Sequence, residues 1–241
     1  PIFFAIMVFL NEKKKNNFLV FFVSIIFILS DVIIFLSGER SALFYLNLST
    51  LFIIIFTNGY KKIRFIGFSI SIFLMIIIST YQPQYAKRVV QQTLTQFHDK
   101  LNDDKNNEKI YFFSKEHEDH YKSAILMFLD NKFLGKGPNG FKKNCHLEKY
   151  RTSFESCSTH PHNTYLQLLA ETGIAGFSSV LFLFILIIYF SLRNFYLQIF
   201  LKKKLFNDFQ IVLFSSFLIS LWPLIPTGNF FGNWIGVVYY L

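Results

Sequence analysis

Long apolar runs alternate with short polar stretches along most of the chain. Each run is long enough, or nearly so, to cross a bilayer as a helix, which needs roughly 17–25 residues. The runs lie at 18–36, 41–57, 63–80, 174–192 and 209–226. Two further apolar stretches, at 1–10 and 234–241, are too short to span, and we interpret them as helices cut at the ends of a fragment. The pattern therefore predicts an all-α, polytopic transmembrane helix bundle with five full spans and two truncated ones.

One long polar segment, 81–162, interrupts the apolar runs and contains all six histidines and both cysteines. Within it, apolar residues recur at helical spacing between 121 and 129, which predicts a helix that ends at the glycine-rich turn 135–140. The sequence thus predicts three parts. They are transmembrane helices with an outward turn at 37–41 in 1–80, a large and partly helical periplasmic loop in 81–162, and an interfacial helix followed by C-terminal transmembrane helices in 163–241.

Composition agrees with a membrane protein. Hydrophobic residues make up 52% of the 241 residues and charged residues only 16%, which is below the roughly 25% of a typical soluble domain. The net charge of +9 would suggest a nucleic-acid partner for a soluble protein. The location of the basic residues gives this charge another meaning.

Basic residues in the short loops predict the orientation of the spans. Ten of them fall on one side if the spans alternate, and the positive-inside rule makes that side cytoplasmic. They are Lys13, Lys14, Lys15, Lys61, Lys62, Arg64, Arg193, Lys202, Lys203 and Lys204. The segment 81–162, with 13 basic and 10 acidic residues, then faces outward, into the periplasm of a Gram-negative cell.

The most informative short stretch is 160–176, which reads His-Pro-His-Asn and then continues as an apolar helical stripe. Pro161 suits the first position of a helix, so we expect His162 in the first turn, at the membrane surface. The positive end of the helix dipole disfavours an imidazolium, and a histidine that is neutral near pH 7 can act as a general base. Gly173 can end this helix, and together with Gly176 it permits close helix packing.

His162, Asn163, Gly173 and Gly176 together resemble the signature of O-antigen ligases, O-antigen polymerases and related protein O-oligosaccharyltransferases. The signature stands where that family has it, after a long loop and directly before a span. Three other segments are similar to the family, so that the resemblance covers about 31–241. They are 37–42, with an outward-facing arginine; 130–138, with Lys132 where the family usually has proline; and a late turn formed by 221–224 and 228–231.

The resemblance implies a glycosyltransferase that uses neither a metal nor another cofactor. The family transfers a polysaccharide from an undecaprenyl-pyrophosphate carrier to an acceptor hydroxyl, a lipid A core sugar for a ligase, at the periplasmic face of the bacterial inner membrane. His162 would be the catalytic base. Arg40 would be the catalytic cation that holds the pyrophosphate, because a guanidinium binds phosphate oxygens in a bidentate manner. The expected partners are the lipid-linked glycan, the acceptor and membrane lipids, with no nucleic acid.

The chain departs from the family where a second arginine is usual, because 116–120 reads Glu-His-Glu-Asp-His. Candidate substitutes for the second phosphate contact are His117, His120, Arg88 and Lys142. Asn163 and His160 complete the expected substrate-binding set.

Each of these residues also has a structural alternative. His117 and His120 would then lie on a solvated face, His160 would serve in packing and Asn163 would cap or orient a helix. Arg40 would be an anchor at the end of a span.

Cys145 and Cys157, separated by eleven residues, lie in the segment predicted to face the oxidising side of the membrane. A disulfide between them is the preferred interpretation. The alternative is a metal site made of Cys145, His146, Cys157 and His160. Because that spacing matches no strong zinc pattern, we expect no metal.

Alternative functions are an O-antigen polymerase that joins lipid-linked repeats, and a non-enzymatic glycan exporter or membrane sensor. A transporter is expected to carry polar or broken helices near the bilayer midplane. Here the spans are nearly uncharged and the polar residues gather at the outer surface, which favours surface chemistry. Asp31 is the exception: it marks a functional position inside the membrane, or it lies close enough to the outer end of its span to reach water.

Overall fold

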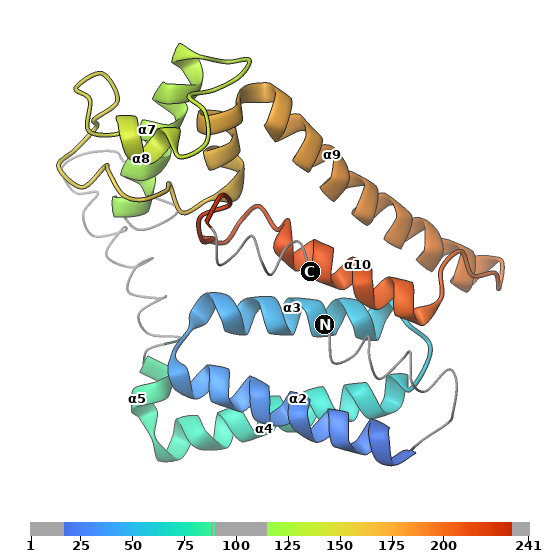
Figure 1. Cartoon of the computed structure of the whole chain (residues 1–241). Helices are drawn as coiled ribbons and strands as arrows, with labels where there is room; N and C mark the ends of the chain where they lie inside the picture. The colour runs from blue at the N-terminus through green and yellow to red at the C-terminus, as the bar shows by residue number, and fades with distance from the viewer. Residues whose placement is uncertain (1–16, 88, 90–114, 233–241) are drawn as a thin grey trace, which may run out of the picture. The chain divides into compact units, whose positions relative to one another are not determined.

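The computed structural model describes residues 17–87, 89 and 115–232 (Figure 1). Within these ranges the structure contains helices and no strand, which confirms the all-α prediction. The helices are α2 (Asn17–Ser37), α3 (Arg40–Phe56), α4 (Lys61–Tyr81), α5 (Pro83–Ala86), α7 (Lys115–Asp130), α8 (Gly140–Asn144), α9 (Thr164–Phe200) and α10 (Asp208–Ser220). The truncated spans predicted at 1–10 and 234–241 lie outside the described residues.

Three of the described helices are long and apolar enough to cross a membrane. They are Phe18–Ser37, Lys61–Tyr81 and Thr164–Phe200. The other two predicted spans, 41–57 and 209–226, correspond to the shorter apolar helices α3 and α10, of 17 and 13 residues. α10 ends at Ser220 because Pro223 and Pro226 follow, and proline interrupts helical hydrogen bonding. Five full spans therefore stay a prediction.

Two compact units divide the chain. Of the described helices, the first unit contains α2, α3, α4, α5, α10 and the part of α9 from Leu186 onward. The second contains α7, α8, the part of α9 up to Ile185, and the segment that begins at Leu221.

In the first unit α2 packs on α3 and α4, and α10 packs on α3 (Figure 1). Val20, Val23 and Phe27 recur at helical spacing on α2 and form a buried cluster with Ile53 of α3 and Val212 of α10. The other faces of these helices expose large apolar side chains, as expected for helices that face lipid.

A polar contact in this unit joins three helices. Asp31 of α2 accepts hydrogen bonds from Ser71 Oγ of α4 at 2.7 Å and from Asn47 Nδ2 of α3 at 3.1 Å. The Asp31 side chain is fully buried, so the alternative that it reaches water is wrong. A buried carboxyl with two donors acts as a clamp between helices, because leaving it unpaired in an apolar environment costs free energy.

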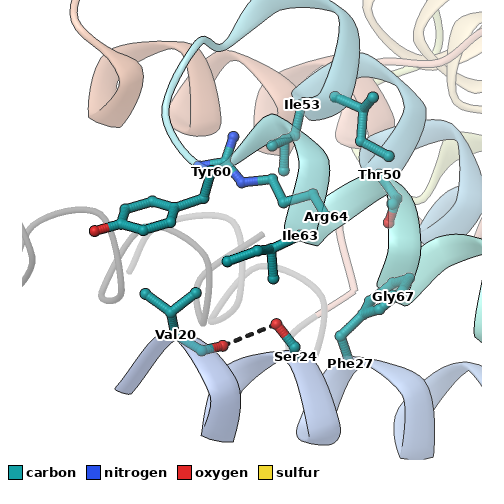
Figure 2. Close-up of a pocket in the computed structure, with 10 residues that line it drawn as sticks. Val20, Ser24, Phe27, Thr50, Ile53, Tyr60, Ile63, Arg64 and Gly67 are labelled. Carbon is teal, nitrogen blue, oxygen red and sulfur yellow. Dashed lines mark hydrogen bonds between the residues drawn. The ribbon is translucent and has the colours of Figure 1, made fainter. Parts of the chain in front are cut away.

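Arg64 of α4 is also buried, beside a small cavity whose lining includes Val20, Phe27 and Thr50 (Figure 2). Its Nη1 donates a hydrogen bond to Thr57 Oγ1 at the end of α3. Arg64 is therefore held inside the protein, on the side predicted to be cytoplasmic.

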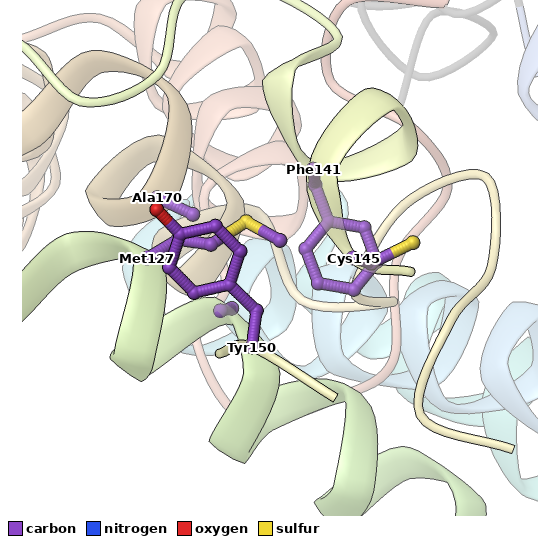
Figure 3. Packing of buried hydrophobic residues seen from close by; sticks show 6 residues of the cluster. Met127, Phe141, Cys145, Tyr150 and Ala170 are labelled. Atoms are coloured by element: carbon purple, nitrogen blue, oxygen red, sulfur yellow. The ribbon is translucent and has the colours of Figure 1, made fainter. Parts of the chain in front are cut away.

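The second unit has its own small core (Figure 3). Its buried members are Ala124, Met127, Phe141, Cys145, Tyr150 and Ala170, with Leu166 packed against them. The helix predicted from the periodicity of 121–129 is confirmed as α7, although it ends at Asp130, before the glycine-rich turn. α7 contributes Ala124 and Met127 to the core, one turn apart, whereas Ile125 and Leu129 of the periodic stretch are exposed.

Side-chain contacts tie the loops of the second unit to this core. Cys145 and Cys157 form a disulfide, with Cα atoms 5.1 Å apart. Asp130, at the end of α7, accepts hydrogen bonds from Lys136, Tyr150 and Lys149. Hydrogen bonding to these three side chains, Lys136 first, holds the pKa of Asp130 below its usual range.

Candidate active site

The start of α9 fixes the backbone around His162. Asn163 is the N-cap of the helix, since its Oδ1 accepts hydrogen bonds from the backbone N–H groups of Tyr165 (3.0 Å) and Leu166 (3.1 Å). The helix begins at Thr164, so the prediction that His162 lies in its first turn is wrong. With asparagine as the cap, the helix begins three residues after the proline that was expected to begin it.

His162 has a backbone φ of 57°, in the left-handed region that non-glycine residues rarely adopt. Its backbone is held there by a hydrogen bond from the Thr227 N–H to the His162 carbonyl oxygen at 2.9 Å. Strained residues of this kind are concentrated at functional sites, where the surrounding structure supports them.

α9 bends at Gly173, whose φ of 64° and ψ of −160° are not helical (Figure 1). A Cβ atom at this position would lie 2.3 Å from the carbonyl oxygen of Phe133, and the Ile174 N–H donates to Lys132 O at 2.8 Å. Glycine is required at 173 both for this conformation and for the close approach. The kink separates a short polar helix after His162 from the long apolar part of α9.

Four histidines from two segments meet in the second unit. The ring centroid of His162 lies 4.1 Å from that of His160, 5.2 Å from that of His117 and 5.4 Å from that of His120. The last two project from the first turns of α7 and are 6.3 Å apart. We call His117, His120, His160 and His162 the histidine cluster. The sequence predicted a part in the site for each of the four, but not that they share one location.

The surroundings keep three members of the cluster, His120, His160 and His162, neutral near pH 7. Burial, and then the neighbouring imidazoles of His160, His117 and His120, lower the pKa of His162 from 6.5 to about 4. Burial is also the main reason why the pKa values of His120 and His160 are lowered. The sequence predicted a neutral His162, but from a helix dipole; burial and imidazole–imidazole repulsion are the actual causes.

A neutral imidazole carries one ring nitrogen that can accept a proton. In His120, Nδ1 is buried and has no hydrogen-bond partner within the described part of the chain. His162 itself is half-buried, so a ligand can reach it from solvent. The cluster is therefore able to take up a proton or to donate N–H groups to an anion.

The segment after α10 holds the cluster in place. His160 Nε2 lies 3.2 Å from the carbonyl oxygen of Thr227, and the Thr227 and Thr164 hydroxyls are 2.9 Å apart. Asn163 Nδ2 donates to the Pro223 carbonyl oxygen at 2.9 Å. The late turn that resembles the family thus packs directly against the His-Asn motif.

Two buried polar residues of α9, which follow the His-Asn motif, form hydrogen bonds with each other and with neighbouring segments. Glu171 accepts hydrogen bonds from the Phe141 N–H at 3.0 Å and from Gln167 Nε2 at 3.1 Å. Gln167 also binds Asn229 Oδ1 at 2.6 Å. Sequence reasoning missed this pair. Its signal was present: two polar residues at i and i+4, on a helix otherwise rich in apolar residues.

The other predicted site residues lie elsewhere. Arg40 is in the first unit and is the first residue of α3, as predicted, and its side chain is half-buried. Lys142 lies on α8 and is exposed. Arg88 lies outside the described residues. The substrate-binding roles of these three residues stay predictions.

Within the described ranges, no group of three or more His, Cys, Asp or Glu side chains has the arrangement needed to hold a metal ion. The alternative metal site also loses two ligands, because the sulfur atoms of Cys145 and Cys157 are bonded to each other.

These features define a class: a helical membrane protein with a polar histidine site directly before a span. A sequence profile described as O-antigen ligase matches residues 22–181, more than half of the chain, and the chain belongs to that family. No curated protein and no solved structure matches the chain. Family membership confirms the resemblance and gives the protein a glycosyltransferase-like role at the membrane in O-antigen and lipopolysaccharide assembly.

Proposed function

We propose that the protein transfers a polysaccharide from undecaprenyl pyrophosphate to the hydroxyl group of a lipid A core sugar, at the periplasmic face of the inner membrane. The observation that carries the proposal is the histidine cluster around His162, whose lowered pKa leaves it unprotonated at pH 7, before the apolar part of α9. Membership of the O-antigen ligase family supports the reaction class.

His162 is the proposed general base. Its imidazole accepts the proton of the acceptor hydroxyl, and the freed oxygen attacks the anomeric carbon of the donor sugar. The bond between that carbon and the pyrophosphate oxygen breaks, and undecaprenyl pyrophosphate leaves with the electron pair. The low pKa supports the first step because His162 is unprotonated at pH 7.

The leaving pyrophosphate needs a cationic or N–H-donating environment. We assign this role to Arg40, and to His117 and His120 in place of the second arginine of the family. The last two lie against His162, so a phosphate there would be next to the base. His160 and Asn163 then orient His162, and Arg88 and Lys142 remain candidates for peripheral contacts with the carrier.

A substitution of His162, compared with a matched control substitution, tests the proposal. His162→Ala is expected to reduce glycan transfer at least about a hundredfold, since general base catalysis typically contributes 10²–10⁴-fold. His146→Ala is the control, because His146 is exposed and stands outside the cluster. Transfer is measured in cells by the attachment of O-antigen to lipopolysaccharide, with the membrane level of each variant checked by immunoblot.

Full transfer by a well-expressed His162→Ala variant would reject His162 as the base. The same cells separate the ligase from the polymerase. Accumulation of lipid-linked polymer without attached O-antigen indicates a ligase, and attachment of single repeats indicates a polymerase. An unchanged lipopolysaccharide on deletion of the gene would favour the exporter or sensor alternative.

A further inference from the structure

An apolar strip runs along the outside of the second unit and belongs to no core. It consists of Ile125, Leu126, Leu129, Phe133 and Leu134, from the second half of α7 and the turn that follows. The exposed fractions of Leu129, Phe133 and Leu134 are 54%, 77% and 73%. A soluble loop domain rarely exposes so many adjacent large apolar side chains.

The opposite face of α7 is already occupied. Ser123, Ala124 and Met127 are fully buried in the second unit. The helix is therefore apolar on two sides over its second half, and among the described residues only one of these sides packs on protein. The strip needs a different apolar surrounding.

Backbone contacts place one end of the strip at the kink of α9. The Lys132 carbonyl oxygen accepts a hydrogen bond from the Ile174 N–H at 2.8 Å. Phe133 and Leu134 contact Gly173 so closely that an added Cβ would lie 2.3 Å from Phe133 O and 2.7 Å from Leu134 N. The backbone of the two most exposed members of the strip therefore lies against residues 173 and 174 of α9.

The character of α9 changes from polar to apolar at the level of residues 173 and 174. Before the kink, α9 carries the buried polar side chains of Gln167 and Glu171. After it, Ile174 is 41% exposed and the apolar part of α9 begins. Lys132, exposed beside the strip, has the position in which a lysine reaches the phosphates of lipid head groups while its neighbours contact acyl chains.

We propose that the apolar strip of α7 and its following turn is inserted into the membrane leaflet, continuous with the lipid-facing surface of α9. The hydrocarbon of the bilayer is then what covers the strip. α7 also carries His117 and His120 in its first turns, so insertion of its far end fixes the depth of the histidine cluster relative to the head groups. This inference does not depend on the proposed chemistry.

Spin labels measure the depth directly. The two native cysteines form a disulfide, so Phe133→Cys provides a single free thiol for a nitroxide. The matched control is Phe154→Cys, in the same unit, at an aromatic residue that is 88% exposed and stands outside the strip. The labelled proteins are reconstituted in vesicles of phosphatidylethanolamine and phosphatidylglycerol, and collisions with oxygen and with a water-soluble nickel chelate are compared.

At 133 we expect oxygen to reach the label more readily than nickel does, because oxygen concentrates in hydrocarbon and the chelate is excluded from it. At 154 the order is reversed. Equal access of nickel at both positions overturns the proposal, as does exclusion of both reagents at 133, which would mean that protein covers the strip. Leu134→Cys repeats the measurement if the first variant does not fold. The spin-label measurement does not involve glycan transfer, so its outcome is independent of the test of His162.

Discussion

Asp31 in the first unit and His162 in the second are both titratable side chains withdrawn from water, but their surroundings differ. Asp31 is fully buried between three helices and accepts hydrogen bonds from Ser71 and Asn47. His162 is half-buried, with three other imidazoles around it and a backbone in the left-handed region. The neighbours of Asp31 donate hydrogen bonds to its carboxyl group, whereas the neighbours of His162 disfavour its protonated form.

The difference separates a structural polar group from a reactive one. A fully buried carboxyl whose partners are donors on neighbouring helices stabilises packing and is out of reach of a substrate. An imidazole that stays unprotonated near pH 7 keeps a lone pair free to accept a proton, which a general base needs. Polar residues inside a membrane protein are thus not equivalent as evidence for function, and their partners decide between the two roles.

The largest expected effect comes from a substitution at the kink of α9, on which the stability of the second unit depends. Gly173→Ala places a Cβ 2.3 Å from Phe133 O at a φ of 64°, and we expect a loss of about 3 kcal/mol or more in the free energy of unfolding. Gly67→Ala in α4 is the control, since nothing lies within 4 Å of its Cβ position. Thermal unfolding in detergent measures both. Equal melting temperatures for the two variants would show that the kink is not needed.

Removal of the disulfide is expected to have the next largest effect, again on the second unit. The bond between Cys145 and Cys157 closes a loop with a sequence separation of 12, and its loss should lower the free energy of unfolding by about 2–3 kcal/mol. The measurement compares unfolding with and without a reductant. The double variant Cys145→Ala, Cys157→Ala serves as control, because the reductant should no longer change its stability. An identical response of both proteins would contradict the prediction.

In the first unit, Asp31→Ala removes an acceptor shared by two helices. We expect a loss of about 1 kcal/mol, since interhelical hydrogen bonds in membranes contribute modestly and Ser71 and Asn47 each keep a backbone acceptor. Asp31→Asn should lose less. Glycan transfer per folded molecule should be unchanged in both variants. A strong loss of transfer with intact folding would move Asp31 from the structural group to the reactive one.

The smallest expected effect is a dependence of stability on pH that comes from the cluster. The pKa of His162 is about 4 in the folded protein and ordinarily 6.5, so the unfolded chain binds more protons between these values. Stability is therefore fully present above pH 6.5 and is lost as the pH falls toward 4. The melting temperature should fall by a few degrees over this interval, and by less in His162→Gln. A melting temperature that rises on acidification would contradict the assigned pKa.

Local patterns were sufficient to predict much of the fold. The apolar runs at 18–36 and 63–80 predicted α2 and α4, and the spacing within 121–129 predicted α7. The His-Asn signature identified the family, and Asn163 was correctly expected to cap or orient a helix. The start of α9 was misplaced, because a proline at 161 and an asparagine at 163 both favour a helix start and only the actual hydrogen bonds decide between them.

Long-range contacts were not predictable in the same way. Nothing in the spacing of His117 and His162 indicates that they lie against each other, or that the Thr227 N–H donates a hydrogen bond to the His162 carbonyl oxygen. Such contacts depend on how the core of Met127, Phe141 and Ala170 orients α7 against α9.

The sequence by itself determined the helices, the membrane character and the family, because these follow from hydrophobic periodicity and from a motif of neighbouring residues. The tertiary structure alone decided that four imidazoles share one place and that the pKa values of His120, His160 and His162 are lowered there. Burial and repulsion depend on distances in space, and residues some forty positions apart in the chain have no such distance until the core between them has packed.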